Sequence, residues 1–451
     1  MEIENSGIYN EIQAIIDGGP TNISNYWVAQ IHTPDLDTEV FKVLSINNFR
    51  DYEKNIGDET TLEVMVPLGV YAKIIYINRA ILEISLQQKP LGEISTENND
   101  TLSTNAERYK AVLVLDGLPP IEGTELGQLS QSELDLMDIL VVRFQLFNRS
   151  LEKLRIVTVG GIYRKTTPEK VIKAVLSNES SRILVGGDKA IEGVDMVEAN
   201  NQETREQFII PQGTKLTRVP TYIQERCGGV YNSGIGTYFQ SGYWYVYPLY
   251  DTTKITSFDK TLTLIKVPKN RFTGLERTYR EDGGSVFVIG TEKTRFTDDG
   301  STNFMIGGNG VRLADADSFM NGFSNTKNNK AVLNRGKNNY EFISRQKDDG
   351  VNNVVLSDNA ISSNPFVEYS KLVSRDGGLY EFVWENSKPD ILFPGMRTKV
   401  FYLSNNELIE LSGILLASQS LTQLAGTGIN VNKHITTTHL TIFVNKTPVM
   451  A

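Results

Sequence analysis

The sequence predicts a mainly β protein with an α+β middle region. Alternating apolar residues mark short strands near both ends of the chain. Leu62, Val64 and Val66 alternate with Thr61, Glu63 and Met65, which is the period of a half-buried strand. Turn clusters separate such runs, whereas helical periodicity is confined to a few short stretches. Short strands joined by tight turns favour a barrel or sandwich over a βαβ enzyme core. At 451 residues, the chain can hold two to four domains.

Residues 1–159 are expected to form the first β domain with a leading helix. Residues 8–17 place Ile8, Ile12, Ile15 and Ile16 on one helical face, which we expect to pack within the chain. The 62–66 run and Val70–Tyr76 are interpreted as a hairpin around Pro67–Gly69. Ser130 and Glu133 form a capping box ahead of a helix through Leu140. Further strands are expected at Tyr26–Ile31, Ile81–Leu86, Tyr109–Leu115, Val141–Phe147 and Leu154–Val159. Leu82, Ile84 and Leu86 are expected to face the interior.

Residues 160–292 are expected to form a mixed α/β domain. Thr167 and Pro168 suit the start of a helix whose apolar stripe consists of Val171, Ile172, Val175 and Leu176. A second short helix is expected over Pro220–Cys227, ended by Gly228 and Gly229. Strands are expected at Tyr243–Leu249, Thr261–Val267 and Ser285–Ile289.

The last two regions differ in composition. Residues 293–365 hold 13 asparagines and are interpreted as an insertion or arm with short strands at Tyr340–Ser344 and Asn353–Leu356. Residues 366–451 return to alternating patterns and are expected to form a second β domain. Its strands are expected at Leu379–Trp384, Lys399–Leu403, Glu410–Ala417 and Leu440–Val444.

Composition narrows the class of protein. The net charge is −9, and residues 1–155 carry 24 acidic and 12 basic side chains, or −12, which leaves +3 for the remainder. An acidic first third argues against a phosphate-gripping surface there. Cys227 is the only cysteine, so no intrachain disulfide can form. No apolar run approaches the ~18 residues of a spanning helix, and the acidic N-terminus does not match a Sec signal. We therefore expect no membrane insertion.

Few residues offer enzyme chemistry. The three histidines are His32, His434 and His439; the last two are five apart in a predicted strand, so they should point to opposite faces. No metal-ligand spacing of a known type is present. Cys227 is expected to be a small buried residue, and the glycine-rich run 228–236 a helix stop and turn, because it follows a helix.

Other candidate sites have simpler structural interpretations. The acidic pairs Asp298–Asp299 and Asp315/Asp317 lack the spacing of a calcium loop. Gly426–Gly428 lacks the strand and helix of a nucleotide-binding loop. The aromatic residues Trp27, Trp244, Trp384 and Tyr243–Tyr247 are interpreted as core or interface rather than a sugar platform. We therefore assign no catalytic, cofactor-binding or metal residue.

Four stretches of the sequence, taken in order, carry a resemblance to one family. The first, Phe41–Leu86, contains R-D-Y, G-D, P-L-G-V-Y and I-L-E-I-S-L. It looks like the first tube-type barrel of the hub proteins of contractile-tail baseplates, which include phage tail hubs and the trunk of type VI secretion spikes. Gly160–Leu176 and Leu216–Leu249 resemble the middle domain of that family. Leu392–Val444, with F-P-G-M, E-L-S-G-I-L and T-T-H-L-T-I-F-V, is similar to its closing barrel.

The resemblance implies two tube-type barrels flanking the mixed domain, and a structural protein without enzymatic activity or cofactor. It implies a homotrimer in the virion tail baseplate, assembled in the host cytoplasm. Its expected partners are the tail tube protein or tube initiator, the central spike and the wedge components, with DNA passing unbound. Three chains would present six barrels to a sixfold tube and threefold symmetry to the spike. The alternatives are another baseplate protein, of the wedge or the sheath, and a tail-associated cell-wall hydrolase.

Overall fold

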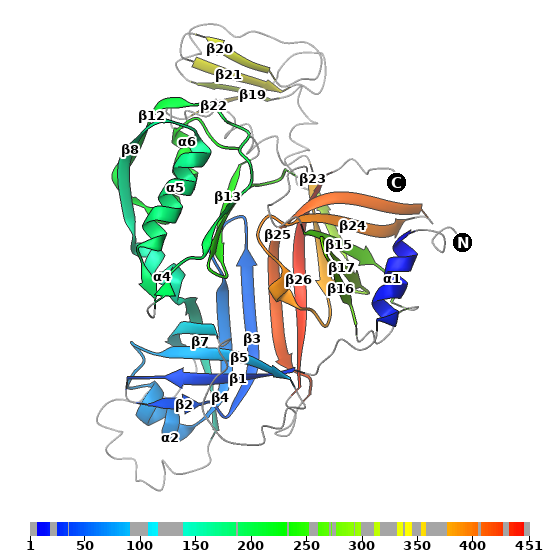
Figure 1. The fold of residues 1–451 in the computed structure, drawn as a ribbon. Coiled ribbons are helices and arrows are strands. Elements are labelled where there is room, and N and C mark those ends of the chain that lie inside the picture. Colours follow the sequence, from blue (N-terminus) through cyan, green and yellow to red (C-terminus); the bar gives the residue numbers. More distant parts are fainter. Residues whose placement is uncertain are drawn as a thin grey trace.

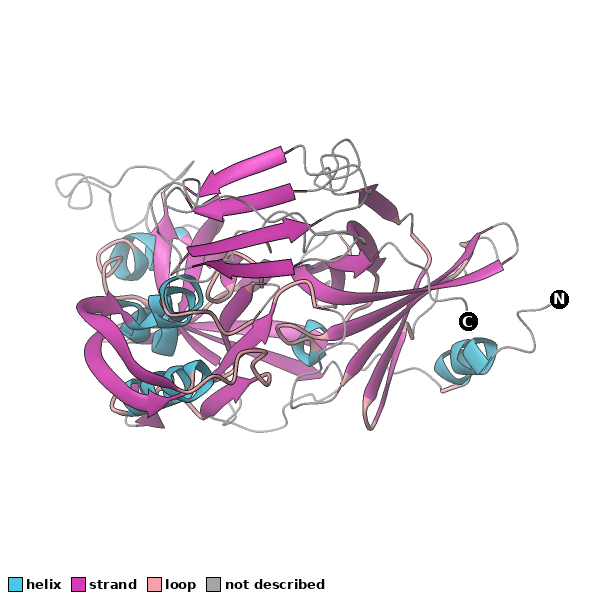
Figure 2. Cartoon of the chain, turned by 90° about the horizontal axis from the view of Figure 1, so that it is seen from above, coloured by secondary structure: helices cyan, strands magenta, loops and turns pink. Residues whose placement is uncertain are grey.

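The computed structural model describes residues 7–18, 25–34, 36–90, 107–115, 139–185, 188–231, 234–251, 260–269, 272, 277–292, 294–298, 311–315, 332–336, 339–344, 353–357, 377–404, 407–426 and 433–445. Strands dominate this part of the chain, and most of its helices gather at one end, with α1 at the other (Figure 2). This confirms the mainly β class with a mixed middle region.

The helices are short and occupy few places in the chain. They are α1 Gly7–Asp17, α2 Leu68–Val70, the π-helix η2 Tyr71–Ile75, α4 Arg149–Ile156, α5 Pro168–Ser181, the 3-10 helix η3 Leu216–Arg218, α6 Val219–Arg226 and the 3-10 helix η5 Pro389–Ile391.

The strands of the first half are β1 Asn25–His32, β2 Asp37–Glu39, β3 Lys42–Asp51, β4 Glu59–Pro67, β5 Glu83–Pro90, β6 Glu107–Val114, β7 Ile139–Asn148, β8 Thr158–Thr166, β9 Leu184–Val185, β10 Asp188–Lys189, β11 Gly193–Met196 and β12 Arg205–Lys215. Those of the second half are β13 Ile235–Gln240, β14 Tyr243–Pro248, β15 Thr261–Lys266, β16 Tyr279–Asp282, β17 Ser285–Gly290, β18 Arg295–Asp298, β19 Val311–Asp315, β20 Val332–Gly336, β21 Asn339–Ser344, β22 Asn353–Ser357, β23 Gly377–Trp384, β24 Arg397–Ser404, β25 Glu407–Leu424 and β26 His434–Asn445.

One large sheet runs through both ends of the chain. Its order is β16-β17-β15-β24-β25-β3-β4-β7-β6-β5-β1-β2, with β26, β23 and β18 branching from β25. The two ends meet where β25 pairs antiparallel with β3, from Ala417 opposite Asp51 to Gln423 opposite Ser45. Figure 1 shows β3 and β4 beside β25 and β26, with β1 and β5 crossing in front. The first and last β regions are therefore neighbours within one chain.

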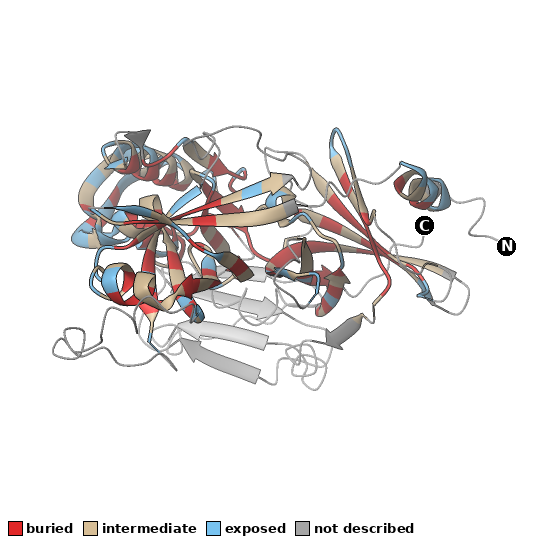
Figure 3. Ribbon diagram, turned by 90° about the horizontal axis from the view of Figure 1, so that it is seen from below, coloured by how far each residue is buried: buried red, intermediate tan, exposed pale blue. Residues whose placement is uncertain are grey.

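Buried side chains follow the strand alternation that the sequence predicts (Figure 3). Leu62, Val64 and Val66 of β4 pack with Leu82, Ile84 and Leu86 in the core of the first β region, which confirms their inward facing. A second and larger core joins the middle domain to the last β region and includes Trp244 and Trp384.

Helix α1 packs within the chain, though not on the first β region. Its Ile12 and Ile15 contact Ile265 of β15, Val267 and Ile289 of β17. The helix therefore covers the far end of the large sheet, beside β15–β17 in Figure 1.

The middle region matches its predicted elements closely. Pro168 begins α5, and all four residues of the expected apolar stripe are buried. Helix α6 ends at Arg226, one residue before the predicted end. Strands β11, β14 and β13 form a small sheet beside these helices, while β8 and β12 form a separate two-stranded ribbon.

Three local predictions are wrong. Val70–Tyr76 is not a strand, because Leu68–Ile75 turns through α2 and η2; β4 instead pairs with β3 and β7. Residues 154–156 belong to α4, which Asn148 caps by accepting from the Ser150 and Leu151 amides. Leu140 lies in β7 and not in a helix. The capping box at Ser130 and Glu133 falls outside the described residues.

The predicted strands in the asparagine-rich segment are present as β21 and β22, which join β19 and β20 in a small sheet. The domain boundaries after residues 159, 292 and 365 stay predictions.

Candidate functional site

A polar cluster of two buried and two half-buried residues lies where the first β region, the middle sheet and the last β region meet. We call Asn48, Arg50, Asp58 and Tyr238 the junction cluster. Arg50 Nε donates to Asp58 Oδ2 across 2.9 Å, and Asn48 Nδ2 donates to the same oxygen across 3.2 Å. Tyr238 of β13 donates its hydroxyl to Asp58 Oδ1 across 2.8 Å. One carboxylate thus holds together β3, the start of β4 and the middle sheet.

Neighbouring contacts extend the junction to residues far apart in the sequence. Arg50 Nη1 donates to the carbonyl of Pro389 across 3.0 Å, and Gln240 Nε2 donates to the Leu392 carbonyl across 2.7 Å. The Tyr247 hydroxyl donates to the backbone carbonyl of Tyr52 across 2.5 Å. The junction therefore holds the three regions in a fixed relation.

Two groups of the junction cluster, Arg50 and Tyr238, keep their protons at physiological pH. Burial is the largest single influence on Arg50 and disfavours its charged form, but Asp58, Tyr52 and Tyr238 together outweigh burial and raise the pKa of the guanidinium. Burial, reinforced by Asp58, raises the pKa of Tyr238 far above its usual range, so its hydroxyl stays a donor. A cavity of about 340 Å³ adjoins the cluster, but groups locked in these protonation states do not suit acid–base chemistry.

A histidine of the last strand bridges two strands of the first β region. The Trp27 amide donates to His434 Nδ1 across 3.3 Å, so Nε2 carries the proton and lies 3.1 Å from the Val43 carbonyl. His434 thus connects β1 and β3 from β26. His439 is exposed on the same strand, in line with the prediction that the two point to opposite faces.

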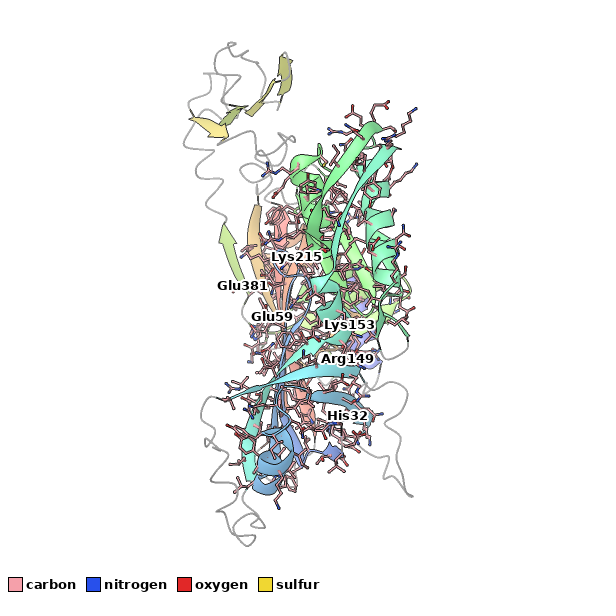
Figure 4. The ribbon with its side chains drawn as sticks, turned by 90° about the vertical axis from the view of Figure 1, so that its left-hand side faces the viewer. His32, Glu59, Arg149, Lys153, Lys215 and Glu381 are labelled. Atoms are coloured by element: carbon pink, nitrogen blue, oxygen red, sulfur yellow. The ribbon has the colours of Figure 1, made fainter. Side chains whose placement is uncertain are left out.

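The third histidine belongs to an arrangement that resembles a Ser-His-Asp triad. His32 Nε2 lies 2.7 Å from Ser85 Oγ, and its Nδ1 lies 2.9 Å from Asp37 Oδ1. No local pattern predicts this arrangement, because the three residues come from three different strands, β1, β2 and β5. Figure 4 places His32 within the first β region, away from Lys215 of the middle region.

This arrangement does not suit acyl transfer. Ser85 is only 4% exposed and lies within β5, where it pairs with Gln30 on one side and Arg108 on the other. A nucleophilic serine needs an exposed hydroxyl and free amides to hold an oxyanion, and both backbone sides of this strand are occupied. In addition, Nδ1 of His32 makes no hydrogen bond of normal geometry within the described residues, so Asp37 does not orient the ring. The contact between His32 and Ser85 links β1 to β5.

The other candidates from the sequence occupy structural positions. Trp244 and Trp384 are fully buried, and Trp27 is half-buried. Cys227 is buried at the end of α6, where burial raises the pKa of its thiol, so it does not suit a nucleophile. Gly228 and Gly229 adopt φ values of 84° and 78°, which confirms the helix stop. Asp299, Asp317, Thr427 and Gly428 lie outside the described residues.

Within the described residues, no group of three or more His, Cys, Asp or Glu side chains could hold a metal ion. In the same part of the chain, no helix is long and apolar enough to cross a membrane.

No protein-family model and no curated protein matches this sequence. Solved structures with a similar fold include the tail protein from Neisseria meningitidis MC58, at 8% identity and a TM-score of 0.46, over 93% of this chain and 96% of that one. The 43 kDa tail protein of prophage MuSo2 from Shewanella oneidensis is 9% identical, with a TM-score of 0.46 over 93% and 98% of the two chains.

A third similar structure is the E. coli c3393 protein, a component of the type VI secretion system similar to T4 bacteriophage tail proteins gp27 and gp5. It is 9% identical, with a TM-score of 0.38 over 91% of this chain and 76% of that one.

Proposed function

We propose that this chain is the structural hub of a contractile-tail baseplate, which adapts a sixfold tail tube to a threefold central spike. The ordered resemblance of Phe41–Leu86, Gly160–Leu176, Leu216–Leu249 and Leu392–Val444 to that family supports the proposal. The structures to which the fold is similar come from the same classes of assembly.

The β3–β25 ladder is the observation that carries the proposal. A sixfold ring built by three chains requires each chain to present two β units side by side at a fixed angle. Pairing from Ala417 opposite Asp51 to Gln423 opposite Ser45 joins the two β regions without a flexible linker. The junction cluster and His434 add side-chain contacts across the same boundary. A chain built in this way suits an adaptor better than a catalyst.

In the proposed ring, barrels from residues 41–159 and 366–451 alternate and line a conduit for DNA. The protein acts without enzymatic activity and binds the tail tube protein or tube initiator, the central spike and wedge components within the virion. An acidic first region would keep a passing polyanion from adhering to the wall.

A cryo-EM map of the assembled baseplate tests this function. The expected map has three copies in one ring and two tube-like units per copy, beneath the tube and above the spike. Six copies in the ring, or one tube-like unit per chain, would contradict the proposal. The isolated protein can be monomeric before the spike joins, so the assembled particle is the decisive sample.

A further inference from the structure

Among the described residues, no strand pairs with the outer backbone edge of β13. Strand β13 is the end strand of the β11-β14-β13 sheet as the structure describes it. The Leu249 amide donates to the Gly234 carbonyl, so even-numbered residues direct their backbone groups toward β14. The Phe239 amide points the other way and donates to the Ile56 carbonyl across 2.7 Å. Ile235 and Thr237 have the same parity as Phe239, and their amides and carbonyls therefore face the open edge.

This edge forms part of the floor of a groove of about 760 Å³. Helix α6 and η3 line one side of the groove, and the turn between β3 and β4 lines the other. Figure 1 shows β13 between α6 and the strands of the large sheet. Thr237 Oγ1 is buried here without a hydrogen-bond partner among the described residues. Because this hydroxyl is enclosed, the groups that the groove offers are the outward-facing amides and carbonyls of Ile235 and Thr237, which can pair with an extended polypeptide.

The charges at the groove favour an acidic occupant. Lys54, Arg218 and Arg226 are exposed, whereas the carboxylates Glu53 and Glu225 are only half-exposed. Glu53 also accepts a hydrogen bond from the Tyr250 hydroxyl. The outer rim therefore presents positive charge to an approaching chain.

We propose that this groove binds an acidic, extended segment of a partner polypeptide, which adds a strand to the open edge of β13. Alternate side chains of the added strand would face Thr221 and Tyr222 on α6, and the others would face the β3–β4 turn. Acidic side chains on the α6 side of the added strand would lie near Arg218 of η3. The proposal goes beyond the hub function and does not depend on it, because it concerns only the groove of the single chain.

Hydrogen exchange at single-residue resolution on the full-length protein tests the proposal. The probe is a short acetylated peptide of alternating threonine and glutamate, and the control peptide has lysine in place of glutamate. We expect the amides of Ile235 and Thr237 to exchange rapidly in the free protein and slowly with the acidic peptide. Gly236 and Tyr238 donate to β14, so their amides should exchange slowly in both states and serve as internal controls.

Matched variants separate the backbone contribution from the side chain. Thr237→Pro removes an amide that β14 does not use, so it should weaken peptide binding about tenfold, which corresponds to about 1.4 kcal/mol. Thr237→Val keeps the amide and should retain most of the affinity. Arg218→Glu changes an exposed side chain and should also weaken binding, which keeps the test informative if the proline variant does not fold.

Three results would overturn the proposal. In the first, the acidic peptide does not slow exchange of the Ile235 and Thr237 amides. In the second, the lysine peptide slows their exchange equally. In the third, these amides exchange slowly without any peptide, and more slowly at higher protein concentration. The last result would show that a second copy of the chain occupies the edge.

Discussion

Arg50 and Asp58 form an ion pair inside the protein, at the point where the first β region meets the middle and last regions. The guanidinium side chain is 9% exposed and the carboxylate 23%. Each also bonds to a residue from another region, Arg50 to Pro389 and Asp58 to Tyr238. Removing either charge leaves the other buried without its partner, so the pair should matter more to stability than an exposed pair does.

Replacing Arg50 with methionine should lower the free energy of unfolding by about 3 kcal/mol or more, because Asp58 keeps a buried charge without its counter-ion. Arg143→Met is the matched control, since Arg143 pairs with Glu63 with its side chain 55% exposed. That change should cost at most about 1 kcal/mol. Thermal and urea unfolding of both variants measures the difference. Equal losses would show that the buried pair has no special role.

Ile84→Asp should prevent stable folding of the first β region. Ile84 is fully buried in the core formed by β4 and β5, and an unpaired carboxylate there costs several kcal/mol, on the order of 3–5 kcal/mol. Ile81→Asp is the control, because Ile81 is 53% exposed and lies three residues earlier. Soluble expression and melting temperature are the measurements. An unchanged melting temperature for Ile84→Asp would contradict the strand facing.

Stability should fall as the pH rises above about 10, the usual pKa of tyrosine. Burial raises the pKa of Tyr238, of Tyr52 and of Tyr231 above that value. A raised pKa means that the folded protein holds the proton more tightly than the unfolded chain does. Each of these tyrosines therefore contributes its full stabilisation of the fold below its pKa in the unfolded chain. That contribution is lost as the pH rises through its pKa in the folded protein.

Tyr238→Phe checks this assignment. At neutral pH the variant should be less stable by about 1–3 kcal/mol, because Asp58 loses a hydrogen-bond donor. Above about pH 10 its stability should fall less steeply than that of the unchanged protein, since one titrating hydroxyl is gone. Melting temperatures of both proteins, measured across pH 7–11, would show this difference in slope. An identical slope in both proteins would assign the alkaline loss to other tyrosines.

The purified protein should not lyse peptidoglycan or cleave simple esters. The triad-like Ser85 is enclosed by its strand partners, which leaves no site for an acyl intermediate. Zymography and an ester assay, each with Ser85→Ala in parallel, are the measurements. Activity that disappears in Ser85→Ala, or when an acidic pair is neutralised, would restore the hydrolase alternative.

Local patterns predicted most strands and the two middle helices. Pro168 begins α5, although the Thr167 side chain makes no capping hydrogen bond, and the alternation of Leu62–Val66 matches the burial pattern of β4. Val70–Tyr76 failed for a physical reason. Its β-branched and aromatic residues favour a strand, yet Tyr71, Ala72 and Ile75 are buried together on one side of a π-helical turn. Packing with the rest of the core outweighs the local preference there.

The candidate site was less predictable than the fold. Arg50, Asp58 and Tyr238 come from two regions of the chain, and nothing local distinguishes Arg50 from an ordinary surface arginine. The Ser85–His32–Asp37 contact and the bridge from His434 likewise depend on which strands become neighbours. Pairings over such sequence distances leave no local periodicity.

The β3–β25 ladder also sets the order of events during synthesis. When the ribosome has released residues 42–51, their partners at 417–423 have not yet been translated. The β3 edge of the nascent N-terminal sheet therefore stays unpaired with β25 until nearly the whole polypeptide has been translated. An unpaired edge can associate with other chains, and long-range pairing folds slowly. We therefore expect truncated chains that lack β25 to aggregate, and we expect native yield to depend on chaperones that shield β3 during translation.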